Sequence, residues 1–255
     1  MDAIAEQAER CAFAIMAKAP GAGRIKTRLA AILTPQEAAE LGCSFLRDMT
    51  ANLALAARTM PIDAYVAFAP AGSEAAFDGA LEPGTGFVLA DGSAPAPAGI
   101  VGLGASLLQA VSSLLNAGYA GVGLLNADSP NLPTARLTGA ARLLRSPGER
   151  VVLGPATDGG YYFIGMKAAH AGLFRAIDWS TPRVGEQTRA RAAELGLSLA
   201  ELEPWYDVDD PASLGALIGD LQAPREPTTF GAPATKRFLE ANRIIDRLAA
   251  SVVGT

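Results

Sequence analysis

The stretch that decides the fold is Val122-Gly123-Leu124-Leu125-Asn126-Ala127-Asp128-Ser129-Pro130-Asn131-Leu132-Pro133. An apolar run ends here in a carboxylate, Asp128, which is followed by two prolines. Short aliphatic runs bounded by turn residues are typical of strands buried on both faces, as in parallel sheets covered by helices. In such sheets, ligands bind just beyond the carboxyl ends of the strands. Asp128 could therefore hold a metal over a phosphate, or could cap its turn or the helix that begins near Thr134.

Strand and helix patterns alternate along the rest of the chain. Apolar runs between turn residues predict strands at residues 11–17, 62–68, 87–89, 122–125, 150–153, 161–165 and 199–203. Helical spacing and capping signals predict helices over residues 34–60, 103–115, 134–144, 184–195, 212–221 and 235–251. Thr34 and Glu37 predict a capping box at the start of the first of these helices. The alternation predicts an α/β protein, with a doubly wound, mostly parallel mixed sheet and helices on both faces.

Length and composition favour one main domain. The chain has 255 residues, half of them hydrophobic, so it can bury a sizeable core. We expect a single domain over residues 1–221, a linker over 222–233 that is rich in Pro and Thr, and a C-terminal helix within 234–255. This helix is amphipathic, so we expect it to pack on the domain or on the partner subunit of a homodimer.

Charge and composition also exclude several classes of function. A net charge of -5 argues against a nucleic-acid partner, which usually needs a strongly basic face. Two cysteines and one histidine do not suffice for a disulfide scaffold, a zinc finger or a His-rich metal cluster. Residues 1–10 lack the pattern of a signal peptide, and no apolar run reaches the roughly 18 residues of a membrane span. We therefore expect a cytoplasmic protein with neither a nucleic-acid nor a membrane partner.

A basic loop with two glycines follows the first predicted strand. It reads Lys18-Ala19-Pro20-Gly21-Ala22-Gly23-Arg24-Ile25-Lys26-Thr27-Arg28-Leu29. Glycines let a backbone approach phosphate oxygens, and Lys and Arg neutralise their charge. The loop has neither the P-loop nor the GxGxxG spacing, and a solvated basic turn is the alternative. The candidate nucleotide-binding residues are Lys18, Ala19, Pro20, Gly21, Gly23, Arg24, Lys26 and Arg28.

A second acidic turn, Asp158-Gly159-Gly160, comes after the predicted strand at 150–153. It could be an ordinary hairpin turn. It also falls where a strand ends, as Asp128 does, and paired glycines leave room for a ligand beside the backbone. Further along, Trp179 could plug the edge of the core or form one wall of a pocket with Ser180 and Thr181.

A third acidic segment is Asp207-Val208-Asp209. Side chains alternate along an extended chain, so both carboxylates lie on the same side. Such carboxylates repel one another unless they share a cation. Mg²⁺ and Mn²⁺ favour carboxylate and phosphate oxygens, so Asp128, Asp207 and Asp209 are the candidate metal ligands. Asp210 stands before Pro211 and is instead a natural N-cap for the next helix.

In this order, these motifs resemble those of the DUF2064 family, a little-characterised set often labelled glycosyltransferases. The resemblance spans about residues 11–221 and rests on residues 18–29, 128–130, 154–162, 179–181 and 207–209. It implies the GT-A-like nucleotide-diphospho-sugar transferase fold, to which molybdenum-cofactor and phospholactate guanylyltransferases are related. Two departures stand out. Residues 101–104, Val-Gly-Leu-Gly, lack the acidic and basic residues that the family tends to have, and Asp210 and Ser213 replace its usual pattern after Asp209.

The resemblance implies roles for the motif residues. Asp128 corresponds to the metal-binding acidic residue of GT-A enzymes, and Asp207 and Asp209 to the carboxylates that complete the metal site in the guanylyltransferases. The cofactor is then Mg²⁺ or Mn²⁺, and the basic loop covers the phosphates. The candidate catalytic residues are Asp128, Lys26 and Asp158. The candidate acceptor-binding residues are Gly159, Gly160, Tyr161, Trp179, Ser180 and Thr181.

Three functions remain open from the sequence. The first is transfer of a sugar from a nucleotide diphosphate sugar to a small-molecule acceptor. The second is nucleotidyl transfer to a phosphorylated or carboxylated small molecule, with release of pyrophosphate, which the basic charge at residues 24–28 would suit. The third is a binding protein that has lost catalysis, which the presence of all three acidic turns disfavours.

Overall fold

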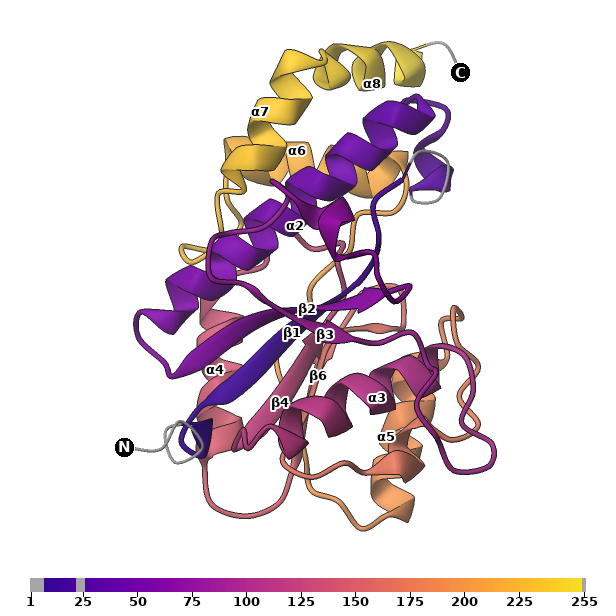
Figure 1. Ribbon diagram of the computed structural model, residues 1–255. Helices are drawn as coiled ribbons and strands as arrows, with labels where there is room; N and C mark the ends of the chain where they lie inside the picture. The colour runs from indigo at the N-terminus through magenta and orange to yellow at the C-terminus, as the bar shows by residue number, and fades with distance from the viewer. Residues whose placement is uncertain (1–6, 22–25, 254–255) are drawn as a thin grey trace.

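The computed structural model describes residues 7–21 and 26–253, and these form a seven-stranded sheet between two layers of helices (Figure 1). The strands lie in the order β3-β2-β1-β4-β6-β5-β7. Only β6 runs antiparallel to its neighbours, β4 and β5. The predicted doubly wound, mostly parallel mixed sheet is therefore confirmed. The strands are β1 (Cys11–Lys18), β2 (Ile62–Ala69), β3 (Gly86–Leu89), β4 (Gly121–Leu125), β5 (Val151–Pro155), β6 (Tyr161–Met166) and β7 (Leu199–Glu201).

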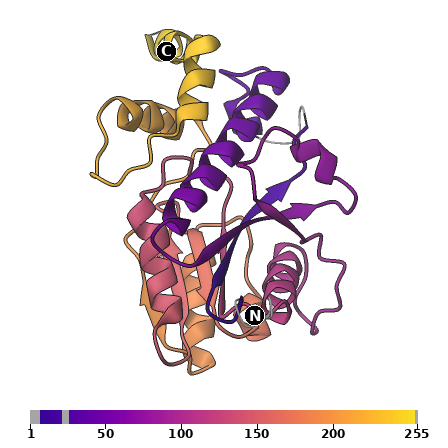
Figure 2. The same cartoon turned by 60° about the vertical axis from the view of Figure 1, so that its left-hand side comes forward.

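The helices cover both faces of this sheet. They are α2 (Pro35–Ala57), α3 (Leu103–Asn116), α4 (Thr134–Arg145), α5 (Val184–Glu194), α6 (Pro211–Gln222), α7 (Pro233–Ala241) and α8 (Ile244–Val253). Three short 3₁₀ helices join them, namely η1 (Thr27–Leu29), η2 (Glu74–Phe77) and η3 (Ala171–Phe174). Figures 1 and 2 show α2 and α3 on opposite sides of the strands. No helix in the described residues is long and apolar enough to cross a bilayer.

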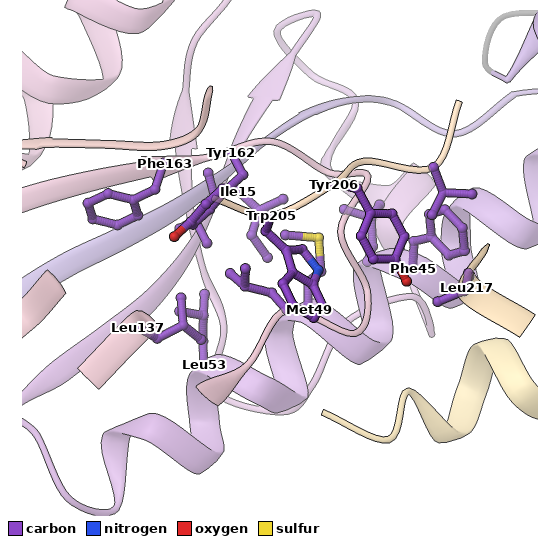
Figure 3. Packing of buried hydrophobic residues seen from close by; sticks show 14 of the residues in the cluster. Ile15, Phe45, Met49, Leu53, Leu137, Tyr162, Phe163, Trp205, Tyr206 and Leu217 are labelled. Atoms are coloured by element: carbon purple, nitrogen blue, oxygen red, sulfur yellow. The ribbon is translucent and has the colours of Figure 1, made fainter. Parts of the chain in front are cut away.

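Two hydrophobic clusters hold the layers together. One joins the sheet to α2, α4 and α6, and it contains Phe45 of α2, Leu137 of α4 and Leu217 of α6 (Figure 3). The other joins the opposite face of the sheet to α3, η3 and α5, and it contains Leu107 and Phe174. Both clusters include residues of the buried strands, as expected for a sheet covered on both faces.

Side-chain caps fix where two of the helices begin. Thr34 accepts a hydrogen bond from the backbone of Glu37, whose own carboxylate accepts one from the backbone of Thr34. Asp210 and Ser213 make the same reciprocal pair of bonds at the start of α6. Both predicted caps are confirmed, so Asp210 has the structural role that the proline after it suggests.

The C-terminal segment differs from the single helix predicted over 235–251. It forms two helices, because the Asn242 side chain donates to the carbonyl of Phe238 at 3.0 Å and Arg243 takes a φ of 53°. α7 packs against α2, where the buried Asp48 accepts hydrogen bonds from the backbone N–H groups of Ala234 and Thr235. The division of the chain at residues 221 and 233, and a subunit contact through this region, stay predictions.

Candidate active site

The three acidic turns, far apart in the sequence, are joined by backbone hydrogen bonds. The turn after β4 is linked to the segment after β7, since Val208 donates its N–H to the carbonyl of Asp128 at 2.8 Å. The turn between β5 and β6 is linked to the same segment, since Thr157 donates to the carbonyl of Trp205 at 2.9 Å. The extended segment 205–209 thus lies between the Asp128 turn and the Asp158 turn.

Buried polar side chains strengthen the junction between the Asp128 turn and this segment. Ser129 donates to the carbonyl of Tyr206 at 3.0 Å, and Asn131 donates to the Tyr206 hydroxyl at 2.7 Å. That hydroxyl donates in turn to Asp220 of α6 at 2.6 Å. Trp205 stacks on Tyr206, and both belong to the hydrophobic cluster in Figure 3. A satisfied buried network of this kind fixes one geometry for the carboxylates on either side of it.

Lys26 connects the basic loop to two of the carboxylates. Its ammonium nitrogen lies 2.5 Å from an Asp128 oxygen and 3.3 Å from an Asp209 oxygen, and it donates to the carbonyl of Val208. It also lies 5.0 Å from the centre of the Phe45 ring. The side chain is only 5% exposed, so the ammonium depends on these partners for its solvation.

The backbone of Lys26 is held in a conformation that non-glycine residues rarely adopt. Its φ is 53° and its ψ is 35°, in the left-handed region, at the residue that precedes η1. Such conformations cost on the order of 1–3 kcal/mol and persist only where the surroundings enforce them, often at functional sites. Lys26 combines this backbone conformation with side-chain contacts to two of the acidic turns.

Asp207 lies where negative charge is concentrated. Burial raises the pKa of its carboxyl to about 6, and the nearby carboxylates of Asp158, Asp209 and Asp128 contribute to the rise. Burial and like charges both disfavour the ionised form of a carboxyl. The site thus carries a surplus of negative charge that a bound cation would relieve.

The donor set fits a hard divalent cation in chemistry, because carboxylate oxygens are the ligands that Mg²⁺ and Mn²⁺ prefer. Within the described residues, however, no three acidic, His or Cys side chains are grouped closely enough to hold an ion, and the ammonium of Lys26 lies between Asp128 and Asp209. A metal held by Asp128, Asp207 and Asp209 therefore stays a prediction, and it requires Lys26 to move.

Two adjoining pockets open at these carboxylates, and both include Asp128 and Asp209 in their walls. The smaller has a volume of about 220 Å³ and lies next to the carboxyl end of β1. Its walls include Lys18, Pro20 and Lys26 of the predicted nucleotide-binding set. The larger has a volume of about 540 Å³, and its walls include Arg28, Asp158, Gly160, Tyr161, Trp179, Ser180, Thr181 and Asp207.

Some predicted residues do not line either pocket. Ala19, Gly21 and the predicted acceptor-binding Gly159 are absent from the walls of both pockets. Ala19 instead donates its N–H to the carbonyl of Ala69. Gly23 and Arg24 lie outside the described residues. The roles assigned to the lining residues stay predictions, but the structure does place the basic, acidic and aromatic motifs around one adjoining pair of pockets.

The wall with the aromatic residues is built by close contact between two loops. The backbone of Gly159 has a φ of +94°, and a Cβ there would lie 2.1 Å from the carbonyl oxygen of Pro182. Gly185, at the start of α5, donates to the carbonyl of Gly159 at 2.8 Å. Trp179 packs against Gly104 of α3, so it both fills the core edge and lines the larger pocket.

Sequence reasoning missed several lining residues. Asn126 and Met16 lie at the ends of β4 and β1, and the rule that ligands bind at strand ends could have identified them. Leu103 and Leu107 line the larger pocket from α3. An apolar stripe on a helix gives no signal that separates a pocket wall from the core, so these two residues could not have been recognised.

Solved structures similar to this chain include nucleotide-dependent enzymes. A protein from Desulfovibrio desulfuricans G20, named "putative nucleotide-diphospho-sugar transferase", is 26% identical with a TM-score of 0.76, over 93% of this chain and 97% of that one. CMP:2-keto-3-deoxy-manno-octonic acid synthetase, solved with CTP, is 13% identical with a TM-score of 0.52, over 84% of this chain and 98% of that one. At this identity it shows a shared fold alone.

A weaker likeness links the chain to Rv0371c from Mycobacterium tuberculosis H37Rv, which was solved in complex with manganese. That structure is 16% identical with a TM-score of 0.44, over 82% of this chain and 98% of that one, and nothing about this chain follows from it. No curated protein matches the chain. A family model described as "Uncharacterized protein conserved in bacteria (DUF2064)" matches residues 52–181, which make up half of the chain. The chain therefore belongs to the DUF2064 family.

Proposed function

We propose that this protein is a metal-dependent glycosyltransferase that moves a sugar from a nucleotide diphosphate sugar to a small acceptor. The observation that carries the proposal is the meeting of three acidic turns and the buried Lys26 between two adjoining pockets. The smaller pocket contains Lys18 and Lys26, which suit phosphates, and the larger contains aromatic and apolar side chains together with Asp158, which suit an acceptor. The name of the Desulfovibrio relative agrees with this reaction.

In the proposed mechanism, the residues of the two pockets divide the work. Asp128, Asp207 and Asp209 would hold the divalent cation, which supplies Lewis-acid stabilisation to the departing diphosphate. Lys26 exchanges its carboxylate partners for phosphate oxygens and keeps its charge paired throughout. The donor occupies the smaller pocket and its sugar extends toward the larger one.

The acceptor hydroxyl attacks the anomeric carbon of the sugar. A bond forms between the hydroxyl oxygen and that carbon, the bond from the carbon to the diphosphate oxygen breaks, and its electron pair leaves with the nucleoside diphosphate. The hydroxyl proton passes to the carboxylate of Asp158, which lines the acceptor pocket. No covalent enzyme intermediate is needed for this sequence.

The basic residues favour a second candidate reaction, nucleotidyl transfer from a nucleoside triphosphate with release of pyrophosphate. Lys18 and Lys26 line one pocket and Arg28 the other, so three cations are available for a triphosphate. The same metal and the same lysine would serve this reaction, but the acceptor would then be an anion, phosphorylated or carboxylated.

A thermal-shift screen with manganese separates the two reactions, because stabilisation grows with the logarithm of ligand concentration over Kd. A larger shift with UDP- or GDP-sugars supports sugar transfer, and a larger shift with GTP or CTP supports nucleotidyl transfer instead. Asp128→Ala should abolish the metal-dependent shift, whereas the exposed Asp246→Ala on α8 should keep it. Unchanged metal and nucleotide binding by Asp128→Ala would refute the proposed site.

A further inference from the structure

The walls of the larger pocket are of two contrasting kinds. Its apolar residues include Leu103, Leu107, Val184 and the ring of Trp179. Its acidic residues are the four carboxylates of the three acidic turns, namely Asp128, Asp158, Asp207 and Asp209. A ligand that fills this volume of about 540 Å³ therefore meets both apolar and acidic side chains.

Among the described residues, positive charge does not balance these carboxylates. Lys26 is paired with Asp128 and Asp209, and Arg28 reaches Asp209 at 4.0 Å. In the part of the chain that the structure describes, no basic side chain forms an ion pair with Asp158 or Asp207. With a divalent cation bound, the positive charges of Lys26, Arg28 and the metal together would equal the negative charge of the four carboxylates. The phosphates of a bound donor would then add further negative charge. An anionic acceptor would meet net repulsion.

Two exposed apolar residues lie at the N-terminal end of α3. Leu103, the first residue of α3, is 45% exposed while it lines the pocket, and Val101 beside it is 73% exposed. Scattered exposed apolar residues need no explanation. These two adjoin the apolar residues of the pocket, so they extend the surface on which an apolar group of a ligand can pack.

We propose that the acceptor is an uncharged or cationic hydroxyl compound with an apolar part, and that phosphorylated and carboxylated acceptors are excluded. Its apolar part packs on Leu103 and Trp179, and its hydroxyl lies toward Asp158. The inference rests on the proposed transferase function, and it favours sugar transfer over nucleotidyl transfer to an anion.

The test uses three probes that share a hydroxyethyl group on a benzene ring and differ only in the para substituent. They are 2-(4-methylphenyl)ethanol, 2-[4-(aminomethyl)phenyl]ethanol and 4-(2-hydroxyethyl)benzoate. Each is titrated into the full-length protein with EDTA and no divalent cation, so that only Lys26 and Arg28 oppose the four carboxylates, and binding is followed by saturation-transfer difference NMR. We expect the neutral and cationic probes to bind at least about ten-fold more tightly than the anion, since the benzoate is repelled by the carboxylates of the pocket.

Variants locate the binding and control for surface effects. Leu103→Glu should weaken binding of the neutral probe about five-fold or more, whereas Leu55→Glu, at a leucine of similar exposure on α2, should leave it unchanged. Asp158→Asn should reduce the difference in affinity between the neutral and the anionic probe. Equal affinity for all three probes, preference for the anion, no binding of any probe, or equal loss in both glutamate variants overturns the proposal. The titrations need neither nucleotide nor turnover, so their failure is distinct from failure of the nucleotide screen.

Discussion

Lys26 is the residue on which the site depends most. A buried ammonium with a strained backbone is costly, and it is retained where charged partners hold it. The partners here are two carboxylates that are themselves candidate ligands of a cation. The lysine and a metal ion would therefore compete for Asp128 and Asp209 until phosphate oxygens give the ammonium new partners.

Replacing Lys26 with Met should separate the effect of the ammonium on metal binding from its effect on nucleotide binding. Without the ammonium, Asp128 and Asp209 become available, so we expect Mn²⁺ to bind about five-fold or more tightly in the absence of nucleotide. Nucleotide binding in the presence of Mn²⁺ should fall, because one phosphate partner is lost. Titration of free Mn²⁺ by electron paramagnetic resonance measures the first effect. Unchanged or weaker Mn²⁺ binding would contradict the competition.

At the scale of elements, the acceptor wall depends on how the β5–β6 turn packs against the start of α5. Gly159 allows a contact with Pro182 that no side chain could accommodate. The sequence left open whether the Asp158 turn is a hairpin, and the antiparallel pairing of β5 with β6 shows that it is one. The Asp158 turn is a hairpin and also lines the larger pocket, so the two roles that the sequence presented as alternatives are compatible.

Gly159→Ala should therefore lower the stability of the protein by more than the positive φ of Gly159 alone explains. Gly196 also has a positive φ, +66°, but a Cβ there meets nothing within 4 Å. We expect Gly196→Ala to lower the free energy of unfolding by about 1 kcal/mol. Gly159→Ala should lower it by about 2 kcal/mol or more, since the turn must shift away from Pro182. Urea unfolding of both variants measures the difference, and equal losses would show that the close contact is unimportant.

The contact between α8 and α2 should give the protein a pH-dependent contribution to stability. Arg247 is 2.6 Å from Glu37, and the hydrogen bonds from Arg247 lower the pKa of that carboxyl to about 2. Because the pKa of Glu37 is lower in the folded than in the unfolded protein, its ionised carboxylate stabilises the fold fully above the unfolded value of about 4.5. This stabilisation is lost as the pH falls toward 2. Arg247 is 39% exposed, so solvent screening keeps the contribution of this pair small.

Urea unfolding at pH 7 and at pH 2.5 tests this contact. Glu37→Gln should be less stable than the parent at pH 7, and the difference should shrink at pH 2.5. Glu40→Gln, one turn further along α2, serves as the matched control and should show little difference at either pH. A loss in Glu37→Gln that persists undiminished at the acidic pH would rule out the charge of Glu37 as its cause.

At the scale of the molecule, the alternating apolar patterns were enough to predict the α/β fold, because each pattern reports local burial. The antiparallel direction of β6 and the break at Asn242 depend on pairing and packing that no local pattern encodes. The family model matches residues 52–181, so it includes Asp128 and Asp158 but neither Lys26 nor Asp209. The motifs indicated which residues meet, but not that an ammonium lies between the carboxylates.

The most direct measurement is a crystal structure of the protein with Mn²⁺ and UDP-glucose or GDP-mannose, with anomalous scattering at the manganese edge. We predict one manganese peak within coordination distance of Asp128 and of at least one of Asp207 and Asp209, with the Lys26 ammonium moved onto the phosphates. A bound nucleotide with Lys26 still paired to Asp128 and Asp209, or a manganese peak away from these carboxylates, would contradict the account.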